Sequence, residues 1–199
     1  MKVTISGLGL MGASLAMALK QNLPDIEIYG YDLPDILDRA VSLKIIDKKM
    51  TNWPEEVNET DIVFLATPLR IIKEHIKDLA KIIRQDIIVT DLGSTKLELY
   101  NFCRSIGFQG LYIGGHPMTG AEKNGINAAN PLLYENAVYI LTDQNTVQTD
   151  PVREKLIPLL SAIKARILVL DPELHPVLLI SGRIFSIQIK KMFIMPLKS

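Results

Sequence analysis

A glycine-rich segment near the N-terminus contains the first residues whose types and spacing predict chemistry. It reads Gly7-Leu8-Gly9-Leu10-Met11-Gly12 and directly follows an apolar run at residues 2–6. A helical stretch comes next, and Asp32 stands twenty positions after Gly12, at the end of a second apolar run. Backbone N–H groups at a helix N-terminus bind phosphate, and a carboxylate accepts hydrogen bonds from ribose hydroxyls. This order of strand, glycine loop, helix, strand and acid predicts a dinucleotide site.

Each of the three glycines in this segment has a structural role in a dinucleotide site. Gly7 permits the tight turn out of the strand, Gly9 lets a pyrophosphate approach the backbone, and Gly12 lets the helix pack close to the strand. Leu33 follows Asp32, so no arginine adjoins the acid to bind a 2′-phosphate, and NAD is expected rather than NADP. An ordinary glycine turn with Asp32 at the surface is the alternative. The cofactor-binding residues expected in this segment are Gly7, Gly9, Leu10, Met11, Gly12 and Asp32.

Two further residues, His116 and Ser94, are the expected catalytic residues. His116 follows two glycines and precedes Pro117, and an imidazole held at a strand end can take a proton from a substrate hydroxyl near neutral pH. The alternative is a structural histidine that binds backbone groups. Ser94 could orient this histidine or contact a substrate hydroxyl, and it could also cap the helix predicted at residues 95–106. Lys96 is expected to be a solvated lysine in the first turn of that helix.

The elements that position these residues alternate between strand and helix. This alternation predicts an α/β fold, a doubly wound and mostly parallel Rossmann-type sheet with helices on both faces. Apolar runs predict strands at residues 2–6, 26–31, 61–66, 87–90, 110–114, 137–141 and 166–170. Helical spacing predicts helices at residues 13–21 (beginning near Leu10), 34–43, 71–83, 95–106 and 151–163, and a short one within 125–133. Residues 48–59 are polar and are expected to be irregular.

Ligands in such folds bind beyond the carboxyl ends of the strands. Four predicted strand ends carry notable residues, and all four should face one crevice: residues 7–12, Thr67-Pro68, residues 91–96 and residues 114–122. Thr67, Pro68 and Ser94 therefore join the expected cofactor-binding residues. No set of His, Cys, Asp and Glu has metal-ligand spacing, so no metal site is expected.

The composition excludes several classes of partner. The formal net charge is zero, so nothing in the charge balance favours nucleic acid or an anionic membrane. The single cysteine, Cys103, cannot form an internal disulfide; it suits a reducing cytoplasm and is expected to be an inert packed residue. The uncharged stretch at residues 3–19 is explained by the glycine loop, so no signal peptide or membrane span is expected. His75 falls on the apolar stripe of a helix and is expected to be packed.

Three segments together resemble the prephenate dehydrogenase family, which includes arogenate dehydrogenases. They are the glycine loop, Asp91-Leu92-Gly93-Ser94-Thr95-Lys96, and Gly114-Gly115-His116-Pro117-Met118-Thr119-Gly120-Ala121-Glu122. Leu133-Tyr134-Glu135-Asn136 and Asp171-Pro172-Glu173-Leu174-His175 add to the resemblance. It implies NAD-dependent oxidative decarboxylation of prephenate or arogenate in tyrosine biosynthesis. His116 would accept the proton of the substrate 4-hydroxyl, and Ser94 would contact both groups. A non-catalytic NAD-binding module and another hydroxyacid dehydrogenase are the alternatives.

The resemblance stops after His175. The family continues with a helical C-terminal domain, which supplies dimerisation and an arginine for the substrate carboxylate. Residues 176–199 instead carry Arg183, Lys190, Lys191 and Lys198 and no acid. We therefore expect a dinucleotide-binding domain at residues 1–172 and an atypical tail at 173–199. A truncation or frame change near codon 176 would explain it, with a loosely packed tail, no dimerisation domain and little activity.

Overall fold

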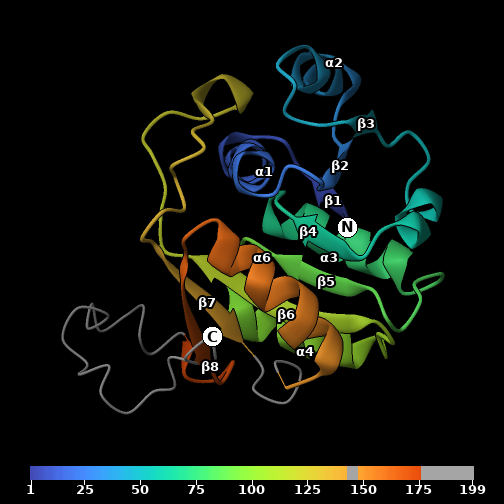
Figure 1. Ribbon diagram of the computed structural model, residues 1–199. Helices are drawn as coiled ribbons and strands as arrows, with labels where there is room; N and C mark the ends of the chain where they lie inside the picture. The colour runs from blue at the N-terminus through green and yellow to red at the C-terminus, as the bar shows by residue number, and fades with distance from the viewer. Residues whose placement is uncertain (143–147, 176–199) are drawn as a thin grey trace.

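The computed structural model describes residues 1–142 and 148–175 (Figure 1). Its eight-stranded sheet has the order β3-β2-β1-β4-β5-β6-β7-β8. The strands are β1 (Lys2–Ser6), β2 (Glu27–Tyr31), β3 (Lys48–Lys49), β4 (Ile62–Leu65), β5 (Ile88–Asp91), β6 (Leu111–Pro117), β7 (Val138–Thr142) and β8 (Arg166–Leu170). The helices are α1 (Leu10–Asn22), α2 (Pro34–Ser42), η1 (Glu55–Glu59), α3 (Leu69–Leu79), α4 (Lys96–Ser105), η2 (Ile126–Ala128), η3 (Val152–Leu156) and α6 (Ile157–Ala162).

The order of the strands reverses at β1. The chain first builds outward from β1 through β2 to β3, and it then returns to place β4 on the other side of β1. All pairings from β3 to β6 are parallel, β7 runs antiparallel to β6, and β8 is parallel to β7. The predicted doubly wound, mostly parallel sheet is confirmed. A crevice at the carboxyl ends of β1 and β4 is the place where such a sheet binds ligands.

Helices cover both faces of this sheet. The continuous apolar sequence of β4 is a consequence of this burial on both faces. Ile62 and Phe64 pack into the same buried cluster as α1, α2 and α6. Val63 and Leu65 alternate with them and pack into the cluster that contains α3 and α4. Successive side chains of a strand point to opposite faces, so a strand that is buried on both faces needs an unbroken apolar run.

Two sequence predictions were wrong, and each has a physical reason. Residues 48–59 contain β3 and η1; β3 consists of two exposed lysines paired with Tyr29 and Gly30, so no apolar run announces it. β6 continues past Gly114 to Pro117, because β7 pairs with it and supplies the hydrogen bonds. The helix expected at 151–163 is present, and its first part is a π-helical segment that runs directly into α6. Pro158 in α6 has no N–H to donate to the preceding turn.

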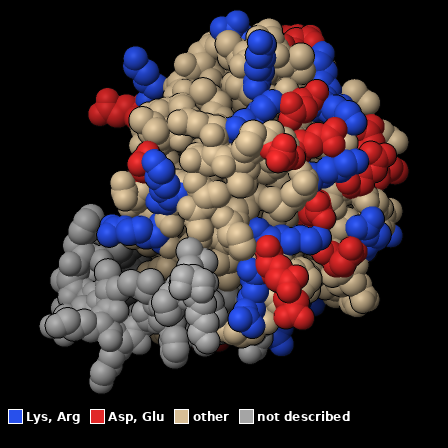
Figure 2. Space-filling view, viewed as in Figure 1, with Lys and Arg blue, Asp and Glu red and all other residues tan. Residues whose placement is uncertain are grey.

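Charges of both signs are interspersed on the right of the face shown in Figure 2. Among the described residues, several exposed side chains form ion pairs, such as Arg70 with Glu74 and Lys81 with Asp78. Across residues 1–142 and 148–175, no helix combines the length and the apolar character that a membrane span needs. The expectations for the tail at 176–199 fall outside the described residues.

The glycine loop yields a stability prediction. A Cβ atom on Gly12 would lie 1.9 Å from the carbonyl oxygen of Gly7, whereas a Cβ on Gly9 would meet nothing within 4 Å. Gly12→Ala should therefore lower the free energy of unfolding by about 1–3 kcal/mol or more, because backbone must move. Gly9→Ala is the matched control and should lower it by only about 0.5–1 kcal/mol, the cost of replacing glycine by alanine at a helix N-cap. Urea unfolding measures both, and equal effects would contradict the close packing of α1 on the loop.

Candidate functional site

The glycine loop presents the start of α1 to the crevice. Gly7 has a φ of 94°, and a Cβ there would lie 2.7 Å from the Ala66 carbonyl carbon, so only glycine fits this turn between β1 and α1. Gly9 is the N-cap of α1, it makes no side-chain cap, and the first turn contains no acid. The first N–H groups of the helix therefore lack intrahelical acceptors and a competing carboxylate. An anion can bind there.

A neighbouring loop braces this helix start. The Tyr134 hydroxyl donates a hydrogen bond to the Met11 carbonyl at 2.8 Å, and Asn130 N–H donates to the Ser14 hydroxyl at 2.9 Å. Tyr134 is fully buried. Residues 130–134 thus bind the first turns of α1 from a position more than a hundred residues away in the sequence.

Asp32 lies beside the glycine loop, at the end of β2. Its Oδ2 accepts a hydrogen bond from Leu8 N–H at 2.6 Å, and its Oδ1 accepts one from Leu33 N–H at 2.7 Å. These bonds orient the carboxylate, and each oxygen keeps acceptor capacity for a ligand hydroxyl. Leu33 is 70% exposed, so the group next to the acid is apolar and uncharged.

Thr67 and Pro68 follow β4 and lie next to the glycine loop. They connect β4 to α3, and Pro68 is the N-cap of that helix. A Cβ placed on Gly7 would lie 2.8 Å from the Thr67 methyl group, so the two residues adjoin. The Thr67 hydroxyl is buried and has no hydrogen-bond partner among the described residues. Thr67 therefore offers an unpaired polar group next to the turn where the dinucleotide loop begins.

His116 is paired with a second histidine. Its Nδ1 lies 2.9 Å from Nε2 of His175, which follows β8 and is 1% exposed. Burial, His175 and Lys96 lower the pKa of His116 to about 4. Burial and Lys96 also lower the pKa of His175 to about 4, although Asp91 opposes this shift. Both rings are therefore neutral at physiological pH, and a neutral ring can accept a proton.

A buried carboxylate, Asp91, is hydrogen-bonded to the backbone of the residue before His116. Asp91 is fully buried, and it accepts hydrogen bonds from Lys96 Nζ, the Tyr112 hydroxyl at 2.9 Å, Gly93 N–H at 2.9 Å and Gly115 N–H at 3.3 Å. Lys96 also donates to the Gly115 carbonyl at 2.6 Å. Burial lowers the pKa of Lys96, and the carboxylate of Asp91 opposes that shift. This network fixes the backbone immediately before His116.

The structure corrects two expectations for this segment. Lys96 is not a solvated lysine, because its side chain is 0% exposed and forms an ion pair with Asp91. Ser94 is exposed and is not the helix cap, because Thr95 occupies that position in α4. The ring of His116 is hydrogen-bonded by His175, where Ser94 was expected to act. Ser94 and His175 do line one hollow of about 390 Å³, together with Thr95, Lys96 and Leu97.

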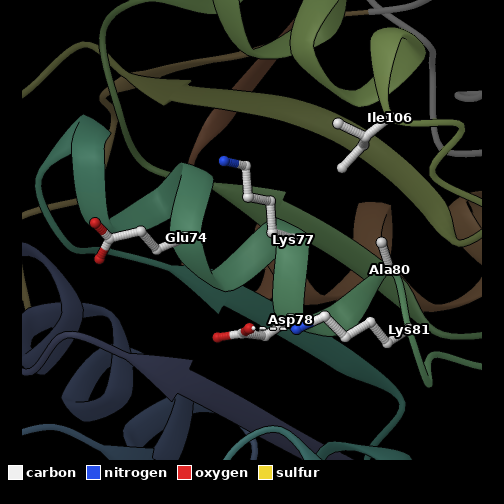
Figure 3. Close-up of a pocket in the computed structure, with 6 residues that line it drawn as sticks. All are labelled: Glu74, Lys77, Asp78, Ala80, Lys81 and Ile106. Atoms are coloured by element: carbon white, nitrogen blue, oxygen red, sulfur yellow. Dashed lines mark hydrogen bonds and ion pairs between the residues drawn. The ribbon is translucent and has the colours of Figure 1, made fainter.

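Other residues and hollows lie outside the crevice. His75 is packed as predicted, with its Nδ1 3.0 Å from the Ser6 hydroxyl and its ring beside Tyr31 and Trp53. Cys103 is buried, and burial raises the pKa of its thiol to about 12, which suits an inert packed residue. Figure 3 shows a shallow open hollow along α3, between Glu74 and Lys81, with Ile106 opposite. None of its lining residues belongs to the strand ends described above.

Comparison with known proteins identifies the family. The nucleotide-binding domain of prephenate dehydrogenase matches residues 15–169. The chain belongs to the prephenate dehydrogenase family. Prephenate dehydrogenases of Lactococcus lactis and Bacillus subtilis are each 35% identical, over 177 and 178 residues, which are 87% of this chain but 48% and 47% of those proteins. The chain thus spans about half the length of the curated relatives that it matches.

Solved structures of this family have the same fold. The prephenate dehydrogenase of A. aeolicus, in complex with hydroxyphenyl propionate and NAD+, superposes with a TM-score of 0.76 at 36% identity, covering 87% of this chain and 61% of that one. Synechocystis arogenate dehydrogenase gives a TM-score of 0.78 at 28% identity, covering 88% of this chain and 61% of that one. The resemblance found in the three sequence segments is therefore confirmed, and the fold is that of the family's nucleotide-binding domain.

The Asp91–Lys96 pair yields a second prediction. Lys96→Met would leave the Asp91 carboxylate buried without its counter-charge, which should cost about 3–5 kcal/mol of unfolding free energy. Adding Asp91→Asn removes the unpaired charge and should recover part of this loss. Lys81→Met breaks an exposed lysine–aspartate pair and is the control, with an expected cost below about 1 kcal/mol. Urea unfolding of the four proteins gives the comparison, and a mild Lys96→Met would show that the pair contributes little.

Proposed function

We propose that residues 1–172 form an NAD-binding domain and that the protein catalyses the oxidative decarboxylation of prephenate, with arogenate as the alternative substrate. One observation carries the proposal: a half-buried, neutral His116 is held at the same edge of the sheet as the glycine loop and Asp32. The A. aeolicus relative, solved with hydroxyphenyl propionate and NAD+, supports both the cofactor and an aromatic, carboxylate-bearing ligand. The product of the reaction with prephenate would be 4-hydroxyphenylpyruvate.

The crevice suits a dinucleotide. Gly9 has open space on its Cβ side, and the N–H groups of Leu10, Met11 and Gly12 begin a helix with no acid in its first turn, so a pyrophosphate can approach the backbone. Asp32 would accept hydrogen bonds from the adenosine ribose, and Thr67, Pro68 and Ser94 would border the rest of the cofactor. NAD would supply the hydride acceptor of the reaction.

The chain's own residues would handle the hydroxyl proton. When a hydride leaves the ring carbon that bears the hydroxyl, the hydroxyl becomes acidic, and a neutral His116 can accept its proton. The ring carboxylate departs as CO₂, and the ring becomes aromatic, which drives the reaction. Positioning of substrate and proton acceptor is then the main task of the protein. Ser94, which is exposed and lines a hollow with His175, would contact the substrate hydroxyl.

The setting of this activity is part of the same proposal. The resemblance to the family implies a biosynthetic enzyme of the cytoplasm, a small-molecule substrate and a homodimer. The family's dimerising helical segment and its carboxylate-binding arginine lie beyond the stretch that resembles this chain. Residues 1–172 would therefore supply the cofactor site and the proton acceptor.

Cofactor choice provides the first test. NAD should bind more tightly than NADP by about 1–3 kcal/mol, because Asp32 pairs with a ribose hydroxyl but would face a phosphate without a counter-charge. Asp32→Ala should weaken NAD binding and reduce this difference. Asp35→Ala, which removes an exposed acid in the first turn of α2, is the control. Calorimetric titration with both cofactors measures the affinities, and equal or reversed affinity in the wild-type chain would overturn the cofactor assignment.

Proton transfer provides the second test. His116→Gln keeps a polar side chain but cannot accept the proton, so NADH formation from prephenate should fall by about 10²- to 10⁴-fold. NAD affinity should stay unchanged, since His116 does not hold the dinucleotide, and this affinity is the control. The ratio of the variant rate to the wild-type rate, both measured on the same chain, is the readout. Equal rates of NADH formation in the variant and the wild type would show that the role of His116 is structural.

Absence of NADH formation with both prephenate and arogenate, in a chain that binds NAD, would contradict the proposed reaction. The chain would then be a non-catalytic NAD-binding module.

A further inference from the structure

The pairing of His116 with His175 has a consequence for which nitrogen of His116 is free. We propose that His175 is a positioning residue: it accepts a hydrogen bond from Nδ1–H of His116 and thereby leaves Nε2 of His116 unprotonated toward the substrate. This inference rests on the proposed function, because that function needs a proton acceptor in the crevice. It gives a task to a histidine that the proposed reaction otherwise leaves unused.

The geometry restricts the choice of nitrogen. An imidazole has two nitrogens, and Nδ1 of His116 is held 2.9 Å from Nε2 of His175. Only Nε2 of His116 is left for a substrate hydroxyl. A neutral imidazole carries one N–H and one lone pair, and the hydrogen bond at one nitrogen decides which form the ring adopts.

The hydrogen bond between the two rings contains one proton, so it has two possible directions. If His175 donated, Nδ1 of His116 would be the acceptor, and Nε2 would carry the hydrogen and could not take a proton. If His116 donates, Nε2 keeps its lone pair and can accept the substrate proton. Only the second direction is compatible with a general base at this position.

The surroundings keep both rings neutral, as this arrangement requires. The charged groups that act on the pair are Lys96 of α4 and Asp91 of β5, which are themselves ion-paired. A neutral His175 is an acceptor as well as a donor, whereas a protonated one could only donate. Lys96 and burial both oppose protonation of His175.

The fold holds His175 firmly enough for this role. A turn after β8 leads to it, in which Leu174 N–H donates to the Asp171 carbonyl at 3.0 Å and Glu173 N–H donates to the Asp171 carboxylate at 2.8 Å. Its side chain is almost fully buried although Leu174 beside it is 53% exposed. His116 is anchored independently, because β6 pairs with β7 at the register His116–Ile140.

The test reads the ring nitrogens directly by ¹⁵N NMR of the full 199-residue chain. The chain contains three histidines, so His75→Gln, His116→Gln and His175→Gln assign every imidazole signal. In the wild-type chain we expect His116 to carry its hydrogen on Nδ1, with a ¹⁵N–¹⁵N coupling across the hydrogen bond to Nε2 of His175. His75, which bonds to the Ser6 hydroxyl, is the internal control in the same spectra.

Variants separate positioning from packing. His175→Phe keeps a ring of similar size but has no acceptor, so the hydrogen of His116 should move to Nε2, the form that histidine favours in solution. His175→Gln places an amide oxygen near the former Nε2 and should keep the hydrogen on Nδ1. A merely structural His175 would predict the same form of His116 in both variants.

The outcomes are decisive in either direction. A wild-type His116 with its hydrogen on Nε2 overturns the proposal, as does a His116 that keeps the hydrogen on Nδ1 in a folded His175→Phe chain. If His175→Phe does not fold, the wild-type spectrum still decides the direction of the hydrogen bond, because the ¹⁵N chemical shifts of Nδ1 and Nε2 of His116 show which nitrogen carries the hydrogen. The sample contains neither NAD nor substrate, so failure of the proposed reaction and failure of this inference are distinguishable.

Discussion

The buried carboxylate of Asp91 is the constraint on which this edge of the molecule depends. A charge inside the sheet must be paired and hydrogen-bonded, or the fold loses several kcal/mol. Asp91 meets this need with Lys96 from α4 and with Tyr112 and Gly115 from β6. Because the carboxylate and these donors come from three successive elements, β5, α4 and β6, satisfying one carboxylate fixes the end of β5, the start of α4 and the backbone that carries His116. Gly115 has no room for a side chain, since a Cβ would lie 2.4 Å from the Asp91 carbonyl oxygen.

The cofactor half of the crevice is built on a different principle. There the backbone itself is the binding group, so side chains are excluded from Gly7 and Gly12 by contacts with Ala66 and with the loop. The reversal of strand order at β1 opens the space above this backbone, and Asp32 is held against it by Leu8 N–H. A rigid backbone cradle on one side and a polar network on the other place two functional regions along one sheet edge.

Much of this was predictable because it is local. Gly7 to Gly12, the two flanking strands and Asp32 lie within one βαβ unit, whose geometry is set by turn sterics and by burial on both faces. The unbroken apolar runs at β4 and β5 announced central strands for the same reason. β3 escaped prediction because its two exposed lysines owe their conformation to pairing with β2 rather than to their own pattern.

The sequence by itself determined the family, the sheet and the residues that ring the crevice, because periodicity, glycine spacing and strand ends are properties of neighbouring residues. Only the tertiary structure decided which side chains pair with one another. Lys96 was expected to be a surface lysine, yet it is buried against Asp91. No local pattern announced that His175, 59 positions away, would be hydrogen-bonded to His116. Burial and long-range pairing depend on how the strands are ordered in space, and no local pattern encodes which charged or polar side chain will meet which.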